Sequence, residues 1–307
     1  MRKYSINRLV AYLVLLGIAP LPSVGNALDL TIVPRFQAGV TDYEFEQKPY
    51  KYPNANGRLT TNKGFKLVSI MPFAGGGATL FANRFFVDFY VQKSFSASDA
   101  ATNPLEAKSF EDAGIPSLDN IIYSEFDREE FSFSVGYALG KQWAFFGGYR
   151  EAKTDFADTL TIDENLTVEG TSVKLRGSGK RNTAFKQDGY FFGGAYAFNI
   201  GKRVMITLNA ALAVLDGKYG SDGSVTLTSP DAPDLEVPVD LGNKHDGDTI
   251  GLNLGAALKG RMNEKFGYTL GVNGYSYNFD AKSSEENPAP DISEKVLRFS
   301  AGLSYQF

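Results

Sequence analysis

The printed sequence closes with Leu297 to Phe307, which reads LRFSAGLSYQF. Counting back by twos from the last residue gives an apolar series: Phe307, Tyr305, Leu303, Ala301, Phe299 and Leu297. The residues between them are polar or very small: Gln306, Ser304, Gly302, Ser300 and Arg298. A period of two is the side-chain period of a β-strand. The stretch therefore predicts a strand with one apolar face and one polar face.

The same alternation recurs along the chain. It predicts ten strands, over residues 28–40, 66–81, 85–95, 130–140, 143–150, 190–200, 204–214, 249–262, 266–277 and 297–307. Pro72 and the run Gly75–Gly77 predict a bend or a bulge in the second strand, since both residue types disturb regular pairing.

The connections between these strands alternate between two lengths. Four are very short, around residues 83–84, 141–142, 201–202 and 263–264, and five are long, at about 48–64, 97–127, 157–184, 217–247 and 281–294. Short turns at one end and long loops at the other are typical of an antiparallel up-and-down transmembrane β-barrel. Two long segments read as strand, turn, strand, so twelve strands are the alternative.

The polar face of these strands carries charges that the apolar face lacks in mid-strand. They are Arg35, Asp88, Arg150, Lys259, Arg261 and Arg298. One Arg or Lys facing lipid at the midplane would cost roughly 2–4 kcal/mol, so this segregation favours a membrane barrel over an exported soluble sandwich. Two interpretations of these candidate lumen-lining charges stay open. They line a narrow pore, or they form a salt-bridge network that plugs the barrel.

The first 27 residues have the pattern of a signal peptide, with domain 28–307 following as the barrel. Arg2, Lys3 and Arg8 precede an apolar run, and small residues precede a cleavage site ahead of Leu28. Loss of these three cations changes the net charge from −4 to −7. An acidic chain argues against a nucleic-acid partner.

The leader, the alternating strands and the terminal SAGLSYQF resemble Gram-negative outer-membrane β-barrel proteins. The resemblance implies export through the general secretory route, integral insertion in the bacterial outer membrane, short periplasmic turns and long extracellular loops. It implies contact with outer-membrane lipid and lipopolysaccharide. It also implies that the barrel assembly machinery reads an assembly signal formed by Phe299, Leu303, Tyr305 and Phe307.

Some barrels of this class are enzymes, so we searched for their chemistry. Omptin proteases use an Asp–His pair and an Asp pair, and outer-membrane lipid hydrolases use Ser with His. The single histidine, His245 in NKHDGD, has no evident partner, because adjacent residues rarely form such a pair. DENLTVEG and SDGSVTL lack calcium-loop spacing, and GSGKR (177–181) lacks the context of a phosphate loop. The absence of cysteine removes thiol chemistry and cysteine metal sites. We expect no metal and no cofactor.

Three functions follow, in order. The first is a non-enzymatic barrel that is structural or that binds a ligand at the cell surface through its long acidic loops; region 98–127 alone holds seven acidic residues and one basic residue. The second is a small porin-like pore for ions or small solutes. The third is a surface hydrolase of the omptin or lipid-directed kind.

Overall fold

The computed structural model describes residues 30–53, 59–62, 64–105, 118–168, 171–282 and 289–307, so the expected signal peptide lies outside the described residues. Within these ranges the chain is almost entirely β-sheet. No helix among the described residues is long and apolar enough to cross a membrane.

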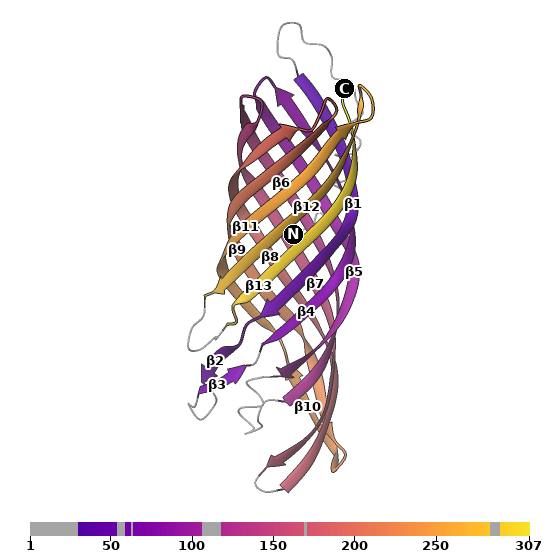
Figure 1. Cartoon of the computed structure of the whole chain (residues 1–307). Coiled ribbons are helices and arrows are strands. Elements are labelled where there is room, and N and C mark those ends of the chain that lie inside the picture. Colours follow the sequence, from indigo (N-terminus) through magenta and orange to yellow (C-terminus); the bar gives the residue numbers. More distant parts are fainter. Residues whose placement is uncertain (1–29, 54–58, 63, 106–117, 169–170, 283–288) are drawn as a thin grey trace, which may run out of the picture.

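Ten strands close into an antiparallel barrel, which confirms the predicted number and fold class (Figure 1). They are β1 (Leu30–Gln47), β4 (Phe65–Ala82), β5 (Phe85–Leu105), β6 (Leu118–Leu139), β7 (Trp143–Val168), β8 (Thr171–Asn199), β9 (Val204–Ser229), β11 (Asn243–Arg261), β12 (Phe266–Ala281) and β13 (Ile292–Tyr305). The terminal β13 pairs with both β1 and β12, and β8 pairs with β9, so the ring has no free edge at the short-turn end.

The alternative of twelve strands is wrong. The short strand β10 (Ala232–Asp240) pairs with β9 alone and lies at the far end from the short turns (Figure 1). A separate small hairpin is formed by β2 (Tyr50–Pro53) and β3 (Leu59–Asn62). Neither addition enters the ring.

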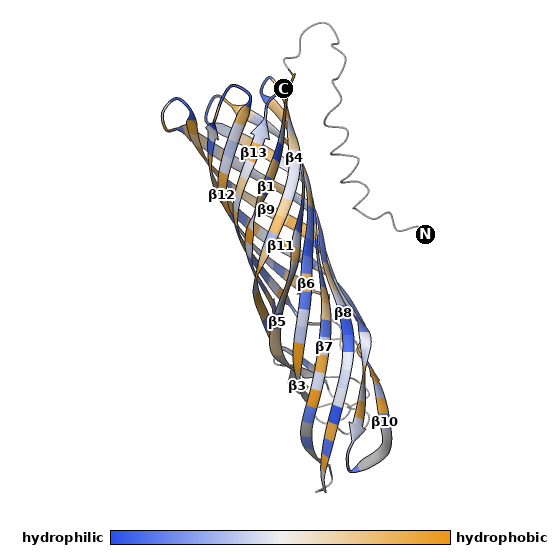
Figure 2. Cartoon of the chain, turned by 90° about the vertical axis from the view of Figure 1, so that its right-hand side faces the viewer, coloured by the Kyte–Doolittle hydropathy of each residue, from blue (hydrophilic) through white to orange (hydrophobic). Residues whose placement is uncertain are grey.

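The barrel strands are much longer than a membrane requires. We expected strands of about 9–11 residues with long loops between them. Instead β8 alone has 29 residues, and most of the predicted loops 97–127, 157–184 and 217–247 consist of strand. Ladder hydrogen bonds between neighbouring strands continue beyond the membrane, which satisfies the backbone there as well. The wall thus forms a tall extension at the end opposite to the short turns, here called the extension (Figure 2).

The alternation of apolar residues changes phase along the strands. On β9, Val214 points outward and is 61% exposed, whereas the next residue, Leu215, points inward and is 3% exposed. On the short-turn side of this point the apolar side chains face outward, and on the extension side they face inward. A barrel surrounded by lipid must be apolar outside, and one surrounded by water must be apolar inside. The change of phase therefore marks the border of the membrane on the side of the extension, here called the upper border.

The interior of the extension is a packed apolar core. The layer nearer the membrane is largely aromatic. It is built from Tyr43, Phe45, Phe126, Phe156, Phe185, Tyr219 and Phe279. Their rings pack at centroid distances such as 4.9 Å for Phe45–Phe156 and 5.5 Å for Phe126–Phe156. A second, aliphatic layer lies further from the membrane and contains Ile122, Leu160, Ile162, Leu175, Val225, Leu227, Val239 and Leu241.

The bend predicted in β4 is absent, and that prediction is wrong. β4 pairs with β1 in unbroken register from Phe65 to Ala82. Pro72 is tolerated because it lies just beyond the last β4–β5 pair, Phe73–Ser94, where no partner needs its missing N–H. The irregularity instead lies on β5, between Ser94 and Ala97. On the extension side of the pair Phe73–Ser94, β4 and β5 share no ladder pairs. We call this unpaired stretch of the wall the seam.

Candidate functional site: the interior of the barrel

Three arginines from three strands converge on one carboxylate near the upper border of the membrane. Glu130 of β6 accepts a hydrogen bond of 2.7 Å from Nε of Arg128. It also accepts bonds of 3.0 Å from Nη2 of Arg150 on β7 and from Nη2 of Arg298 on β13. Arg128 lies on the same strand as Glu130 and Arg150 on the neighbouring strand β7, whereas β13 lies on the other side of the ring, so the Arg298–Glu130 bond ties opposite walls together across the lumen. We call Arg128, Glu130, Arg150, Glu294 and Arg298 the central network.

The second carboxylate of the central network is Glu294 on β13. It is bound by Arg128 and accepts a hydrogen bond of 2.8 Å from the Tyr43 hydroxyl. Arg128 also donates to Thr154 on β7 at 2.8 Å. The side chains of Arg128 and Glu294 are 1% and 0% exposed, so water hardly reaches this pair. Hydrogen bonds satisfy most of the polar atoms of this buried pair, although Nη2 of Arg128 and Oε2 of Glu294 have no hydrogen-bond partner among the described residues.

Aromatic rings hold the planes of the two outer arginines. The Arg150 guanidinium lies 4.3 Å from the ring centroid of Tyr275 and is bonded to the Tyr277 hydroxyl. The Arg298 guanidinium lies 5.3 Å from the same Tyr275 ring and 5.2 Å from the Phe73 ring. Cation–π contacts of this type strengthen when water is excluded. The central network and its rings thus form one compact layer beneath the aromatic core.

A second ion pair lies nearer the short turns. Arg35 on β1 and Asp88 on β5 form a two-pronged contact of 2.5 and 2.8 Å, and Thr79 on the intervening β4 bonds to both. Arg35 and Asp88 are each about a fifth exposed, so this pair contacts water in the lumen. Two further predicted lumen charges, Lys259 and Arg261 on β11, lie closer still to the short-turn end, where they line an open cavity.

The structure gives His245 no catalytic partner. The side chain is buried, its ring stacks on Tyr219 at a centroid distance of 6.4 Å, and its Nδ1 has no hydrogen-bond partner. Burial lowers the pKa of His245 below its ordinary value, and the nearby Asp246 carboxylate opposes that shift. Asp246 follows it on the strand and is exposed on the opposite face, as alternation requires.

The other motifs lie on strands rather than in binding loops. GSGKR lies within β8, and its Arg181 is paired with Asp158 of β7 at 2.8 Å. Most of DENLTVEG (163–170) belongs to β7. Within the described part of the chain, no group of three or more His, Cys, Asp or Glu residues is placed to hold a metal ion.

The terminal strand faces lipid with its apolar side. Phe299, Leu303 and Phe307 are exposed on the outside of the barrel. Tyr305 packs between Phe266 and Phe307 at ring distances of 5.0 and 4.7 Å. The backbone N–H of Phe307 donates to Ile32 O at 3.2 Å, so the last residue is tied to the first barrel strand. The role of these residues as an assembly signal remains a prediction.

Three of the seven charges in the central network and the Arg35–Asp88 pair are absent from the residues that the sequence predicts for the lumen. Arg128, Glu130 and Glu294 fell in or beside segments that we predicted as loops. The signal that could have found them is the charged run DREE (127–130) on the same strand as EFSFSVGYALG. Every second residue of that run faces inward, which places two opposite charges, Arg128 and Glu130, in the lumen.

Comparisons with known proteins agree with this architecture. No protein-family model matches the sequence, and no curated protein sequence matches it. The structure of the outer membrane protease OmpT from Escherichia coli matches with a TM-score of 0.55 at 10% identity, over 93% of this chain and 99% of that one. This chain has the fold of an outer-membrane β-barrel.

Weaker matches belong to the same class of structures. The toluene transporter TodX from P. putida matches with a TM-score of 0.32 at 12% identity, over 91% of this chain and 90% of that one. Neisserial surface protein A matches with a TM-score of 0.28 at 12% identity, over 89% and 97%. The outer-membrane β-barrel fold points to the bacterial outer membrane as the location, and it is compatible with many different functions.

Proposed function

We propose that this chain is an integral outer-membrane β-barrel with a closed lumen, which acts at the cell surface through its extension as a structural or ligand-binding protein. The central network carries this proposal. Its five charged side chains are almost inaccessible to water and bond opposite walls together, directly beneath a packed aromatic layer. A solute that entered from the short-turn end would have to break ion pairs and then displace a dry apolar core.

The surface of the extension supports a binding role. Beside the seam, Val68 and Ile70 on β4 and Phe95 on β5 are exposed although they lie beyond the lipid belt. Ile121 and Tyr123 on β6 are exposed in the same region. Apolar side chains that face water far from the bilayer are typical of contact surfaces for other molecules. The acidic surface that the sequence predicts for the long loops stays a part of this proposal.

We propose no enzymatic activity. Among the described residues, the one histidine has a ring partner but no hydrogen-bonded carboxylate, serine or threonine. A histidine that activates a serine or threonine nucleophile, or that a carboxylate orients, has such a partner within hydrogen-bond reach. The likeness to a protease is a likeness of fold at 10% identity and does not bring the protease activity to this chain.

The proposal includes the remaining expectations about location. We infer export through the general secretory route, insertion by the barrel assembly machinery and an environment of outer-membrane lipid and lipopolysaccharide. The outward apolar belt and the aromatic side chains near the short turns, such as the pair Trp143–Tyr196 at 4.7 Å, support a position in the bilayer.

Conductance tests the closed lumen. The full chain is refolded in detergent, its folded state is checked by heat-modifiable migration in a gel, and it is inserted into planar lipid bilayers. A potential of ±100 mV, which is worth roughly 2.3 kcal/mol per elementary charge, is applied across the bilayer. We expect no conductance steps. Stable single-channel steps from the unaltered protein would overturn the proposal in favour of the porin-like pore.

A hydrolase screen tests the proposal that the chain has no enzymatic activity. The same preparation is incubated with fluorogenic peptides and with phospholipid and lipid A substrates. We expect no turnover above that of a His245→Ala variant. Turnover that disappears in this variant would establish the surface hydrolase instead.

A further inference from the structure

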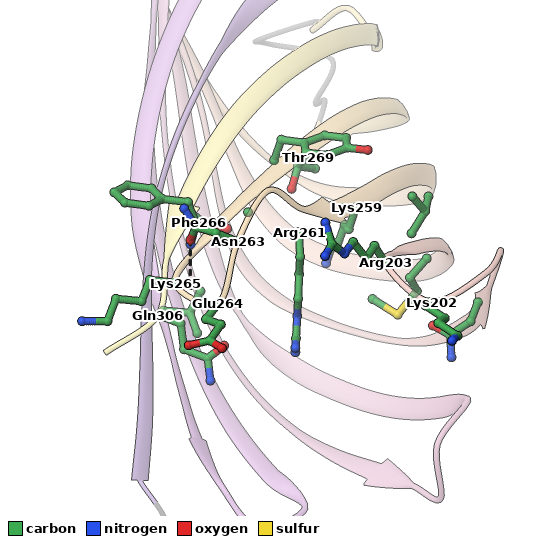
Figure 3. Close-up of a pocket in the computed structure, with 18 residues that line it drawn as sticks. Lys202, Arg203, Lys259, Arg261, Asn263, Glu264, Lys265, Phe266, Thr269 and Gln306 are labelled. Carbon is green, nitrogen blue, oxygen red and sulfur yellow. Dashed lines mark hydrogen bonds between the residues drawn. The ribbon is translucent and has the colours of Figure 1, made fainter.

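A cationic cavity opens at the short-turn end of the lumen. Its volume is about 390 Å³, and it is lined by the adjoining ends of β9, β11, β12 and β13. We call it the mouth cavity. Its charged lining consists of five cations and one carboxylate: Lys202, Arg203, Lys259, Arg261, Lys265 and Glu264. Figure 3 shows Arg203, Lys259 and Arg261 inside the mouth, with Lys265 extending away from them.

These cations differ from all the arginines deeper in the barrel. Arg35, Arg128, Arg150 and Arg298 each contact a carboxylate within 3.0 Å. In contrast, no carboxylate among the described residues forms an ion pair with Arg203, Lys259, Arg261 or the other two. Asp88 is the nearest interior acid to Lys259, and it is already bound by Arg35 and Thr79.

Unneutralised cations that share a confined space repel one another. All five side chains are exposed at the open end of the lumen, so water weakens this repulsion without removing it. A chain that merely needed a polar mouth could use the Ser, Thr and Asn residues found elsewhere in this lumen. The arrangement is therefore best explained by a negatively charged ligand that completes it.

The lining also restricts the ligand to an oxyanion, among which phosphate makes use of all three cations. Arg203 and Arg261 offer planar guanidinium groups, which bind phosphate through paired hydrogen bonds, and Lys259 supplies a compact charge beside them. Thr269, Ser304 and Gln306 add neutral hydrogen-bonding groups to the lining. The volume is at the lower end of the range for small-molecule sites, so it accommodates a head group but not a whole lipid.

We propose that the mouth cavity binds a phosphate ester, held chiefly by Arg203, Lys259 and Arg261. Two sources share this chemistry: a small soluble phosphate ester, and the head group of an anionic phospholipid in the adjacent leaflet. The inference goes beyond the proposed surface function and does not depend on it, because the central network separates this cavity from the extension.

Binding is measured on the refolded full chain in neutral detergent micelles. One arm titrates glycerol 3-phosphate by calorimetry, and the other adds phosphatidylglycerol to the micelles, with phosphatidylcholine as the uncharged reference, and detects bound lipid by native mass spectrometry. The variant is Lys259→Gln/Arg261→Gln. The control is Arg84→Gln/Lys141→Gln, which removes two cations from the other short turns, outside the cavity. Heat-modifiable migration confirms that each variant is folded.

We expect saturable binding of at least one probe, weakened about tenfold or more by the cavity variant and less than twofold by the control. Binding of glycerol 3-phosphate identifies a soluble source, and selective retention of phosphatidylglycerol alone identifies the lipid. The proposal is overturned if neither probe binds below about 10 mM, or if the control variant loses as much binding as the cavity variant.

Discussion

Glu130 of β6 and Arg298 of β13 meet at 3.0 Å although 168 positions separate them in the sequence. The bond joins strands on different sides of the ring and so links the two walls across the lumen. Arg298 lies within the terminal stretch LRFSAGLSYQF, so the last strand contributes both to the lipid face and to the closure of the lumen.

Loss of the Glu130 carboxylate leaves three buried arginines short of a partner. We expect Glu130→Ala to lower the free energy of unfolding by about 3–5 kcal/mol, because breaking one side of a buried pair leaves charge uncompensated. Glu129→Ala is the matched control, since Glu129 points outward and binds only the exposed Lys93. Its effect should stay below about 1 kcal/mol. Urea unfolding in micelles, followed by fluorescence of the single Trp143, measures both. Equal effects would contradict the central network as a stabilising unit.

His245 should make the extension sensitive to acid. Burial lowers its pKa in the folded state, so the fold favours the neutral ring. This stability is fully present above the unfolded pKa of about 6.5 and is lost as the pH falls below that value. We expect His245→Phe, which keeps an aromatic ring against Tyr219, to reduce the dependence of unfolding on pH between 7 and 5. The measurement is urea unfolding at a series of pH values. An unchanged slope in the variant would show that other groups cause the acid sensitivity.

Two neighbouring glycines on β4 should respond in opposite ways to an added methyl group. A Cβ on Gly77 would lie 2.0 Å from the backbone oxygen of Phe89, whereas a Cβ on Gly76 would approach nothing closer than 3.4 Å. We expect Gly77→Ala to lower the free energy of unfolding by about 1–3 kcal/mol. Gly76→Ala should be neutral or stabilise by up to about 1 kcal/mol, because it removes backbone freedom from the unfolded chain. If both variants unfold alike, the close approach of β4 and β5 at Gly77 is not what requires glycine there.

The terminal phenylalanine should matter for assembly more than for stability. Phe307 is exposed and contacts Tyr305 at a ring distance of 4.7 Å, so its removal leaves the barrel wall intact. We expect Phe307→Ser to reduce the amount of folded protein in the outer membrane of a Gram-negative host several-fold. The purified variant should refold in micelles as the unaltered protein does. Gln306→Ser is the control, and an equal yield of the two variants in cells would argue against Phe307 as part of an assembly signal.

Alternation was enough to predict the ten strands, because lipid outside and a polar lumen inside impose the same rule on each of them. It was not enough to predict their length. Beyond Val214 and Leu215 the apolar residues lie on the inner face instead of the outer face. If the apolar face of a strand is assumed to be the same along its whole length, this part of the sequence no longer alternates as a strand should. The outer halves of the strands were therefore taken for loops.

The interior charges were predictable as a class but not as pairs. Arg35 and Asp88 lie on β1 and β5, and only the closed ring with β4 between them brings the two groups to hydrogen-bond distance. The convergence of Arg150 and Arg298 on Glu130 depends likewise on which strands face each other across the lumen. The order of the strands follows from the alternation of short and long connections. The stagger between neighbouring strands around the barrel cannot be read from the sequence of any single strand.

The change of phase on β9 also determines how far the extension projects from the membrane. About twenty residues of β8 lie beyond the corresponding level, and a strand that rises roughly 3.3 Å per residue and leans by about 45° lifts its far end some 40 Å from the lipid. Molecules recognised at that tip would be met in the surrounding medium, at a distance where the charge of the bilayer is screened by salt. Under the proposed surface function, the residues that anchor the chain in the membrane and those that would meet a ligand at the tip are therefore separate sets.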